Sequence, residues 1–219
     1  MPLPSKTEYL LELDAALTRA WPDNRLINIV CHGHSVPAGY LRTPVVDPFA
    51  AYPHRMHRAL KEKYPFALLN VIVTAKGGEN SEGGMARLEA EVLSHRPDLL
   101  TIDYGLNDLG IGHARAEAAW RAMIEQTLAR GVKVILMTPT LDSSVSIERL
   151  AEHPLNTGAE RIRALAAEYG VGLADSLAAW AAYCRAGTPL NTLLSQSNHP
   201  TRRGHDLVVD EIIDWFPMR

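Results

Sequence analysis

The sequence predicts an α/β fold whose sheet is mainly parallel, five-stranded and covered by helices on both faces. Five short apolar runs are rich in β-branched residues or leucine and lack strict alternation, which is typical of strands buried on both faces. Segments with a helical period separate these runs at a spacing of roughly 30–45 residues, which indicates βαβ units with right-handed crossovers. The predicted strands cover residues 26–31, 68–75, 99–104, 132–138 and 171–174.

Each predicted helix carries an apolar stripe with the period of an α-helix. The first helix is expected over about residues 5–20, where Ser5 and Glu8 have the spacing of a capping box. Gly131 and Gly170 end two of the later helices. The stripes consist of Leu10, Leu13 and Leu17; of Met85, Leu88 and Val92; of Trp120, Met123, Ile124, Thr127 and Leu128; of Ile162, Leu165, Ala166 and Tyr169; and of Val208, Ile212 and Trp215.

Composition predicts a single domain over residues 1–219, with its core at about 26–215. Apolar residues make up 47% of the 219 positions and charged residues 21%, which is typical of a globular chain able to bury a large core. No internal repeat, low-complexity tract or linker interrupts the pattern. The formal net charge of −3 provides no electrostatic footprint for nucleic acid, so no nucleic-acid partner is expected.

Cysteine usage and the amino-terminal residues predict a cytoplasmic protein without a membrane partner. Cys31 and Cys184 are far apart in the chain and cannot form a disulfide framework, which suits a reducing compartment. The first residues, Met-Pro-Leu-Pro-Ser-Lys, contain no apolar segment of a secretory signal, and no stretch approaches 18 apolar residues.

Polar residues follow the first three predicted strands, where ligands bind in open parallel sheets. Ser35 follows the first strand, Gly77 and Gly78 follow the second, and Asn107 follows the third. The loop before the last helix carries His199. These four segments are therefore expected to meet at one edge of the sheet.

Together these residues match the requirements of acyl transfer: a nucleophile, a base and donors for the developing oxyanion. Ser35 is the candidate nucleophile and His199 the candidate base. The backbone N–H groups of Ser35 and Gly78 and the side-chain amide of Asn107 would supply the donors. Taken one at a time, each has a plainer interpretation, since Ser35 could cap a helix, His199 could be a solvated turn residue and Gly78 could serve a simple turn.

The order of these residues resembles the four sequence blocks of the SGNH/GDSL hydrolase superfamily. The first block reads Gly-His-Ser-Val-Pro-Ala-Gly over 33–39, the second covers 75–88, the third is Gly-Leu-Asn-Asp over 105–108, and the last is His-Pro over 199–200. The resemblance spans roughly residues 26–215 and implies a flavodoxin-like three-layer α/β/α sandwich. It further implies an esterase mechanism with Ser35 and His199 as catalytic residues and Ser35, Gly78 and Asn107 as oxyanion donors.

Two positions depart from that family pattern. His34 stands where the family has aspartate, and we interpret this as altered support for the loops, together with Asp108, rather than as a second base. Gln196 stands three residues before His199, where the family has the aspartate that orients the imidazole. We therefore expect a Ser35–His199 pair oriented by a main-chain oxygen near Ser195 or Gln196, or by an unidentified carboxylate, for which Asp175 is a weak candidate.

Several other residues invite functional interpretations that we consider weaker. His32, His34, His113, His199 and His205 could be taken for metal ligands, but no accompanying carboxylate or cysteine spacing supports this, so neither a metal nor a cofactor is expected. Cys31 is expected to be a small buried hydrophobe, and His205 to cap or pack at the start of the last helix. A long connection follows Ser35, and its polar and aromatic residues are expected at the surface; they are Arg42, Tyr52, His54, Arg55 and His57.

The sequence thus predicts a serine ester hydrolase that acts on a small-molecule ester. The family resemblance suggests a short acyl group such as acetyl, with a carbohydrate as its carrier and with lysophospholipids and thioesters as open alternatives. A catalytically reduced module that binds carbohydrates or small molecules is the main alternative, because two aspartates of the pattern are missing. A metal-dependent hydrolase using the histidines is a third. The oligomeric state is not predicted.

Overall fold

Five parallel strands form the centre of the protein. The structure, a computed structural model, describes residues 2–217. The strands are β1 (Leu26–Gly33), β2 (Leu68–Val73), β3 (Leu99–Asp103), β4 (Lys133–Met137) and β5 (Gly172–Ala174), and their order in the sheet is β2-β1-β3-β4-β5. All four pairings are parallel, which confirms the predicted sheet.

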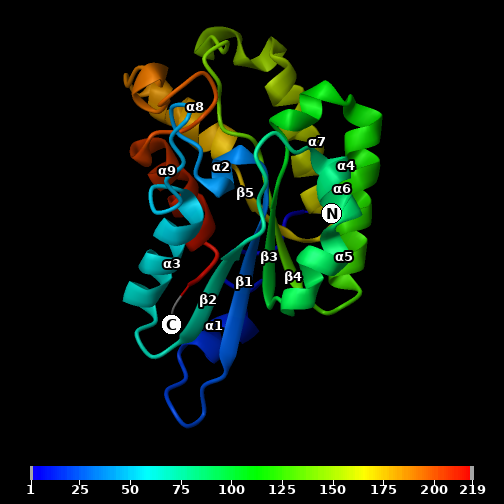
Figure 1. Cartoon of the computed structure of the whole chain (residues 1–219), viewed down its shortest axis with the longest axis vertical. Helices are drawn as coiled ribbons and strands as arrows, with labels where there is room; N and C mark the ends of the chain where they lie inside the picture. Colours follow the sequence, from blue (N-terminus) through cyan, green and yellow to red (C-terminus); the bar gives the residue numbers. More distant parts are fainter. Residues whose placement is uncertain (1, 218–219) are drawn as a thin grey trace.

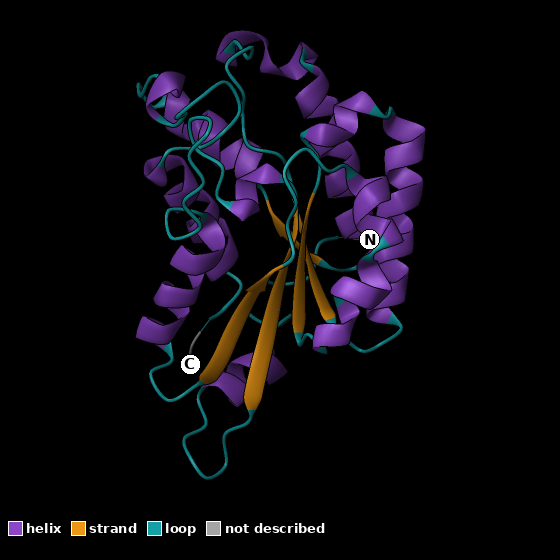
Figure 2. Ribbon diagram, viewed as in Figure 1, coloured by secondary structure: helices purple, strands orange, loops and turns teal. Residues whose placement is uncertain are grey.

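Helices cover both faces of this sheet and complete the predicted three-layer sandwich (Figures 1 and 2). In this view α3 (Tyr52–Lys63) and α9 (Arg202–Ile213) lie on one side, and α4 (Ser81–Ala86), α5 (Leu88–Glu91), α6 (His113–Leu128) and α7 (Pro154–Tyr169) lie on the other. The remaining helices are α1 (Leu11–Leu17), α2 (Ser35–Ala38) and α8 (Ser176–Arg185). Short 3₁₀ turns are η1 (Leu93–His95), η2 (Asn107–Gly110), η3 (Ile147–Glu152) and η4 (Leu190–Thr192).

Several helix boundaries differ from the predicted ones. The first helix spans only Leu11–Leu17 instead of 5–20, because Ser5 closes a separate turn by accepting the N–H groups of Glu8 and Tyr9 at its carbonyl. The stripe Met85–Leu88–Val92 is divided at Arg87 between α4 and α5. Trp215 lies just beyond the end of α9, where its indole donates to the Leu173 carbonyl at 3.0 Å.

Two helices, α3 and α8, were not predicted. The sequence predicts that Tyr52, His54, Arg55 and His57 lie at the surface of a long connection, but they lie in α3, and Tyr52 is completely buried. Tyr52, Met56 and Leu60 recur every four residues and form the inner face of this helix. His54, Arg55 and His57 are half-buried, and Arg55 forms an ion pair with Asp206 of α9.

Burial explains why the strands read as continuous apolar runs. Every residue of β3 is buried, and Ile29, Val30, Leu100 and Ile135 have no exposed surface. A strand covered on both faces by helices needs apolar side chains on both. A second apolar cluster, around Leu141, Leu155, Trp180 and Leu193, packs beneath the loops that follow β4 and precede α9.

The strand order determines where loops can meet. The chain passes from β1 outward to β2 and then returns to place β3 on the opposite side of β1. The order therefore reverses at β1, and the loops after β1, β2 and β3 emerge side by side at the carboxyl edge of the sheet. Within residues 2–217, every helix is too short or too polar to cross a lipid bilayer.

Candidate active site

Ser35 lies at the corner between the first strand and a short helix. Strand β1 ends at Gly33, His34 is the N-cap, and Ser35 is the first residue of α2. The side chain is only 5% exposed. Its Oγ lies 3.1 Å from Nε2 of His199. The predicted nucleophile and base, 164 residues apart in the sequence, are thus within hydrogen-bonding distance.

The other ring nitrogen of His199 fixes the tautomer. Nδ1 lies 2.8 Å from the carbonyl oxygen of Leu41, and a carbonyl can only accept a hydrogen bond. Nδ1 therefore carries the proton, and Nε2 is left as the acceptor for the Ser35 hydroxyl. This is the protonation pattern that a general base requires.

The main-chain oxygen that orients His199 comes from a different residue than predicted. A main-chain carbonyl does orient the imidazole, but it belongs to Leu41 and not to Ser195 or Gln196. Ser195 instead donates from its N–H (2.8 Å) and its hydroxyl (3.0 Å) to the carbonyl of His199. Asp175 is not the missing carboxylate either, because it caps α8 and forms an ion pair with Arg163 at 2.7 Å.

Gln196 supports the orienting carbonyl from a distance. Its Oε1 accepts hydrogen bonds from the Thr43 N–H at 2.8 Å and from the Thr43 hydroxyl at 3.0 Å. Thr43 lies two residues after Leu41, so this contact joins the loop of the orienting carbonyl to the loop of His199. Both side chains are exposed, and such bonds contribute only about 0.5–1.5 kcal/mol each.

We expect Gln196→Ala to lower kcat of the expected ester hydrolysis by less than about tenfold. The change loosens the Leu41 loop but does not remove the carbonyl oxygen that orients His199. Gln196→Glu should stay near the wild-type value, since a carboxylate accepts the same two hydrogen bonds. Steady-state kinetics of the three proteins provides the measurement. A loss in Gln196→Ala as large as that of a His199 variant would contradict orientation by Leu41.

The imidazole of His34 lies against Ser35, the next residue in the sequence. Its Nδ1 accepts the N–H of Val36 at 3.3 Å and lies 3.4 Å from the Ser35 Oγ. Its Nε2 is 3.4 Å from an oxygen of Asp103, and both side chains are buried. His34 therefore caps the helix that presents the serine, and Asp103 holds the histidine ring in place.

The three candidate oxyanion donors lie in the loops that follow β1, β2 and β3. The N–H of Ser35 is at the first position of α2, where no intrahelical acceptor exists. Gly78 has a φ of +76°, which favours glycine, and a Cβ there would meet no atom within 4 Å. The Asn107 amide uses one of its two N–H bonds on the Glu79 carbonyl at 2.8 Å, which leaves the second available.

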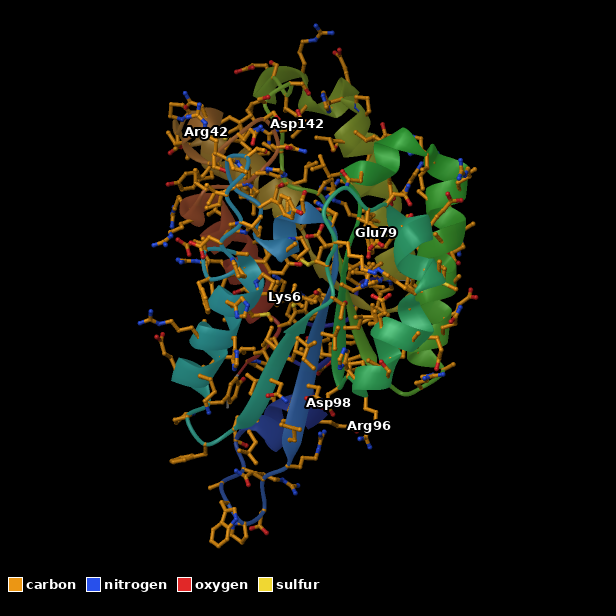
Figure 3. The ribbon with its side chains drawn as sticks, in the orientation of Figure 1. Lys6, Arg42, Glu79, Arg96, Asp98 and Asp142 are labelled. Atoms are coloured by element: carbon orange, nitrogen blue, oxygen red, sulfur yellow. The ribbon has the colours of Figure 1, made fainter. Side chains whose placement is uncertain are left out.

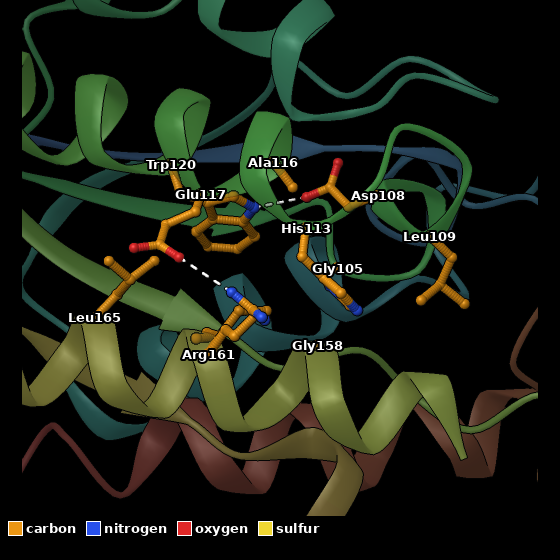
Figure 4. A pocket seen from close by; sticks show the side chains of 11 residues that line it. Gly105, Asp108, Leu109, His113, Ala116, Glu117, Trp120, Gly158, Arg161 and Leu165 are labelled. Carbon is orange, nitrogen blue, oxygen red and sulfur yellow. Dashed lines mark hydrogen bonds and ion pairs between the residues drawn. The ribbon is translucent and has the colours of Figure 1, made fainter.

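Asp108 joins the loop after β3 to the helices beside it. Its carboxylate accepts the N–H of Ser81 at 2.8 Å and the indole N–H of Trp120 at 2.6 Å. It also lines a small cavity of about 30 Å³ between α6 and α7, whose wall includes the ion pair of Glu117 and Arg161 (Figure 4). Ser35 and His199 do not line this cavity.

No sequence pattern predicts a polar cluster that includes Glu79, the residue after Gly78. Glu79, Arg87, Tyr104 and His32 contact one another between the sheet and α4, and Figure 3 shows Glu79 in this position. Arg87 and Tyr104 lie within or beside the sequence blocks, but nothing in their spacing indicates that they meet. What marks these residues as a cluster is that charged and polar side chains are buried together, and this is visible only in the structure.

Burial lowers the pKa of His32 to about 4, with the nearby Arg87 charge acting in the same direction. The unfolded chain takes up a proton near pH 6.5, while the folded His32 does not until about pH 4. Its contribution to stability is therefore present above pH 6.5 and is lost as the pH falls toward 4. We expect this to reduce the free energy of unfolding by roughly 3 kcal/mol over that range.

Urea unfolding of the wild type and of His32→Gln at pH 7, 5.5 and 4 measures this effect. The variant should lose less stability between pH 7 and pH 4 than the wild type does. His205, whose pKa burial lowers to about 3, acts in the same direction in both proteins and so cancels in the comparison. An identical pH dependence in the two proteins would contradict the assignment to His32.

The remaining candidates occupy structural positions. Cys31 is fully buried in β1, and burial raises the pKa of its thiol to about 12, as expected of an inert hydrophobe. His205 packs in the first turn of α9, where its Nδ1 accepts the N–H of Tyr52 at 3.2 Å. His113 lies at the start of α6 and lines the cavity beside Asp108.

A buried serine at a strand-to-helix corner, held by a histidine of the correct tautomer, defines a serine-hydrolase type of site on a parallel α/β sheet. The sequence profile of the GDSL-like Lipase/Acylhydrolase family matches residues 31–207. The chain belongs to this family, which confirms the resemblance found in its sequence blocks.

Individual relatives agree with this assignment. Esterase TesA of Pseudomonas aeruginosa is 30% identical over 115 residues, which cover 52% of this chain. The match spans about half the length of that relative (50%). Among solved structures, the acetylxylan esterase Axe2 of Geobacillus stearothermophilus has a TM-score of 0.75 at 19% identity, over 88% of this chain and 95% of its own.

A second solved structure shares the same fold. LAE5, an alpha/beta hydrolase enzyme from the metagenome of Lake Arreo in Spain, has a TM-score of 0.70 at 18% identity. The likeness covers 92% of this chain and 98% of that one. At these identities the two solved structures establish the fold, and the α/β sandwich is thereby confirmed.

Proposed function

We propose that the protein is a serine-dependent carboxylic ester hydrolase that acts on short-acyl esters, with acetyl esters of carbohydrates as its substrate class. The observation that carries the proposal is the pair of contacts made by His199, 3.1 Å to the Ser35 hydroxyl and 2.8 Å to the Leu41 carbonyl. Membership of the GDSL-like family supports the reaction class. The fold shared with an acetylxylan esterase supports the acetyl group.

In the proposed reaction, the Ser35 oxygen attacks the ester carbonyl while His199 Nε2 takes the hydroxyl proton. The carbonyl oxygen becomes an oxyanion, held by the N–H groups of Ser35 and Gly78 and by the free N–H of Asn107. When the tetrahedral intermediate collapses, the protonated His199 gives its proton to the leaving alcohol. Water, activated by the same imidazole, then hydrolyses the acyl-serine and restores the enzyme.

The cation formed on His199 has a neutral partner at Nδ1. In the family pattern an aspartate would stabilise this cation by its charge, whereas here the Leu41 carbonyl provides only a dipole. The carbonyl still holds the ring in the productive tautomer and orientation. We infer that the pair is catalytically competent and that the missing aspartate affects rate rather than reaction type.

A panel of p-nitrophenyl esters from acetate to octanoate, run beside acetylated xylooligosaccharides, tests the proposal. The highest kcat/KM is expected for acetate among the p-nitrophenyl esters, with release of acetate from the carbohydrate. Labelling by a fluorophosphonate should modify Ser35. If no ester is hydrolysed and Ser35 stays unlabelled, the chain is instead a non-catalytic binding module. A preference for long acyl chains would overturn the proposed substrate class but not the esterase reaction.

A further inference from the structure

Glu79 connects two of the three candidate oxyanion donors. It directly follows Gly78, and its carbonyl accepts the side-chain N–H of Asn107 at 2.8 Å. Its own N–H donates to the carbonyl of Lys76 at 3.3 Å. The loop after β2 and the loop after β3 are thus joined at this residue, one position from the Gly78 N–H.

The Glu79 carboxylate is held by two other side chains, those of Arg87 and Tyr104. Nε of Arg87 donates to its two oxygens at 2.8 and 3.0 Å, and the Tyr104 hydroxyl donates to it at 2.8 Å. A further Arg87 nitrogen bonds both Glu79 and, at 3.2 Å, the Tyr104 hydroxyl. The side chains of Arg87 and Glu79 are only 9% and 14% exposed, so water screens this ion pair weakly.

These contacts close a ring through the polypeptide. Tyr104 follows the last residue of β3 and precedes Asn107 by three residues. The Glu79 side chain is therefore tied to one end of this segment, and the Glu79 carbonyl is tied to the other end. Glu79 consequently cannot rotate without breaking bonds to both.

His32 and Gly84 enclose the ring of Tyr104. Nε2 of His32, on β1, lies 3.1 Å from the Gly84 carbonyl, and its ring meets the Tyr104 ring edge-on with centroids 5.2 Å apart. Residue 84 must be glycine, because a Cβ there would come within 2.4 Å of the Tyr104 ring. The ring of Tyr104 is thereby held between β1 and α4.

We propose that Glu79, held by Arg87 and Tyr104, is the positioning residue that fixes the Gly78 N–H and the Asn107 amide relative to each other as oxyanion donors. This inference rests on the proposed esterase function. Donors stabilise a transition state best when they are already oriented before the charge develops. Without its anchored carboxylate, Glu79 can rotate about its backbone, and the adjacent Gly78 N–H moves with it.

Glu79→Gln tests the proposal, with Glu91→Gln as its matched control. Glu91 also bonds Arg87, at 3.3 Å, and it pairs with Lys76 at 2.8 Å, but its side chain is 49% exposed, so water screens both ion pairs and their loss should cost little. Glutamine keeps the size of the side chain and removes its charge. We expect kcat for p-nitrophenyl acetate to fall about 10- to 100-fold in Glu79→Gln, with KM changed less than threefold. Glu91→Gln should stay within twofold of the wild type.

The rate of Ser35 labelling by a fluorophosphonate provides a second readout, since the phosphoryl oxygen occupies the position of the oxyanion. It should fall in parallel with kcat, while a thermal melt shows that the variant is folded at the assay temperature. Tyr104→Phe, which keeps the ring and removes the donor to Glu79, should show a smaller decrease of the same kind. It replaces Glu79→Gln as the test if that variant does not fold.

Equal kcat values for Glu79→Gln and Glu91→Gln would overturn the inference, as would a rise in KM with unchanged kcat. These outcomes are separable from failure of the proposed function. If Ser35→Ala is inactive while Glu79→Gln is fully active, only the positioning role is lost. If Ser35→Ala retains wild-type activity, the esterase mechanism itself is wrong.

Discussion

Ser35→Ala is expected to lower kcat for ester hydrolysis by about 10³- to 10⁶-fold. The Oγ removed by this change is the atom 3.1 Å from His199 Nε2, and no other hydroxyl is found at that nitrogen in the described part of the chain. The proposed oxyanion donors belong to the backbone and to Asn107, so they should survive the substitution and leave a residual rate. Active-site titration with a fluorophosphonate, together with steady-state kinetics on p-nitrophenyl acetate, measures the loss.

Ser197→Ala is the matched control for this experiment. Ser197 is an exposed serine two residues before His199, and its hydroxyl contacts only the neighbouring Asn198, at 3.4 Å. The control should retain wild-type kcat and labelling. Both variants should unfold at the wild-type urea concentration, because neither side chain fills a large volume in the core. Undiminished labelling of Ser35→Ala would show that a different residue is the nucleophile.

Much of the fold could be predicted because its strands are buried on both faces. β1, β3 and β4 are almost entirely buried, so their apolar runs stand out in the sequence. Helix α3 was missed although Tyr52, Met56 and Leu60 have helical spacing, since histidines, arginines and a proline surround them. Proline is compatible with the first turn of a helix, where its missing N–H has no partner to lose.

Helix α8 was missed for a different reason. Leu177, Trp180 and Ala181 form its buried face, at spacings of three and four residues. The positions between them are mostly alanine, which is also apolar, so the buried face does not stand out as an apolar stripe among polar residues. An Ala-rich helix of this kind has high intrinsic propensity but a weak amphipathic pattern.

The site shows where prediction from sequence ends. Ser35 and His199 could be predicted because each carries its chemistry in its own side chain and lies in a recognisable block. The orienting group is a main-chain carbonyl at Leu41, and any residue supplies a carbonyl, so no sequence pattern marks it. Its placement depends on the loop closed by the bridge between Tyr40 and Val46, which is a tertiary feature.

His199→Ala is expected to lower kcat by about 10³- to 10⁶-fold, because the serine hydroxyl then has no positioned base to accept its proton. Labelling of Ser35 by a fluorophosphonate should slow in parallel. The truncation opens a space bounded by the Leu41 carbonyl and the Ser35 hydroxyl, the two partners of the lost ring. Added imidazole can occupy this space with the same two hydrogen bonds, and we expect it to restore part of the activity.

The second histidine beside Ser35 makes this experiment decisive. Nδ1 of His34 is only 0.3 Å farther from the Ser35 Oγ than Nε2 of His199 is, at 3.4 Å against 3.1 Å. Its lone pair, however, already accepts the Val36 N–H, and Asp103 holds its other nitrogen. His34→Ala should therefore cost less in kcat than His199→Ala, and added imidazole should not restore its activity because the site is buried. The reverse order of the two losses would make His34 the base and assign His199 to the support of the loop.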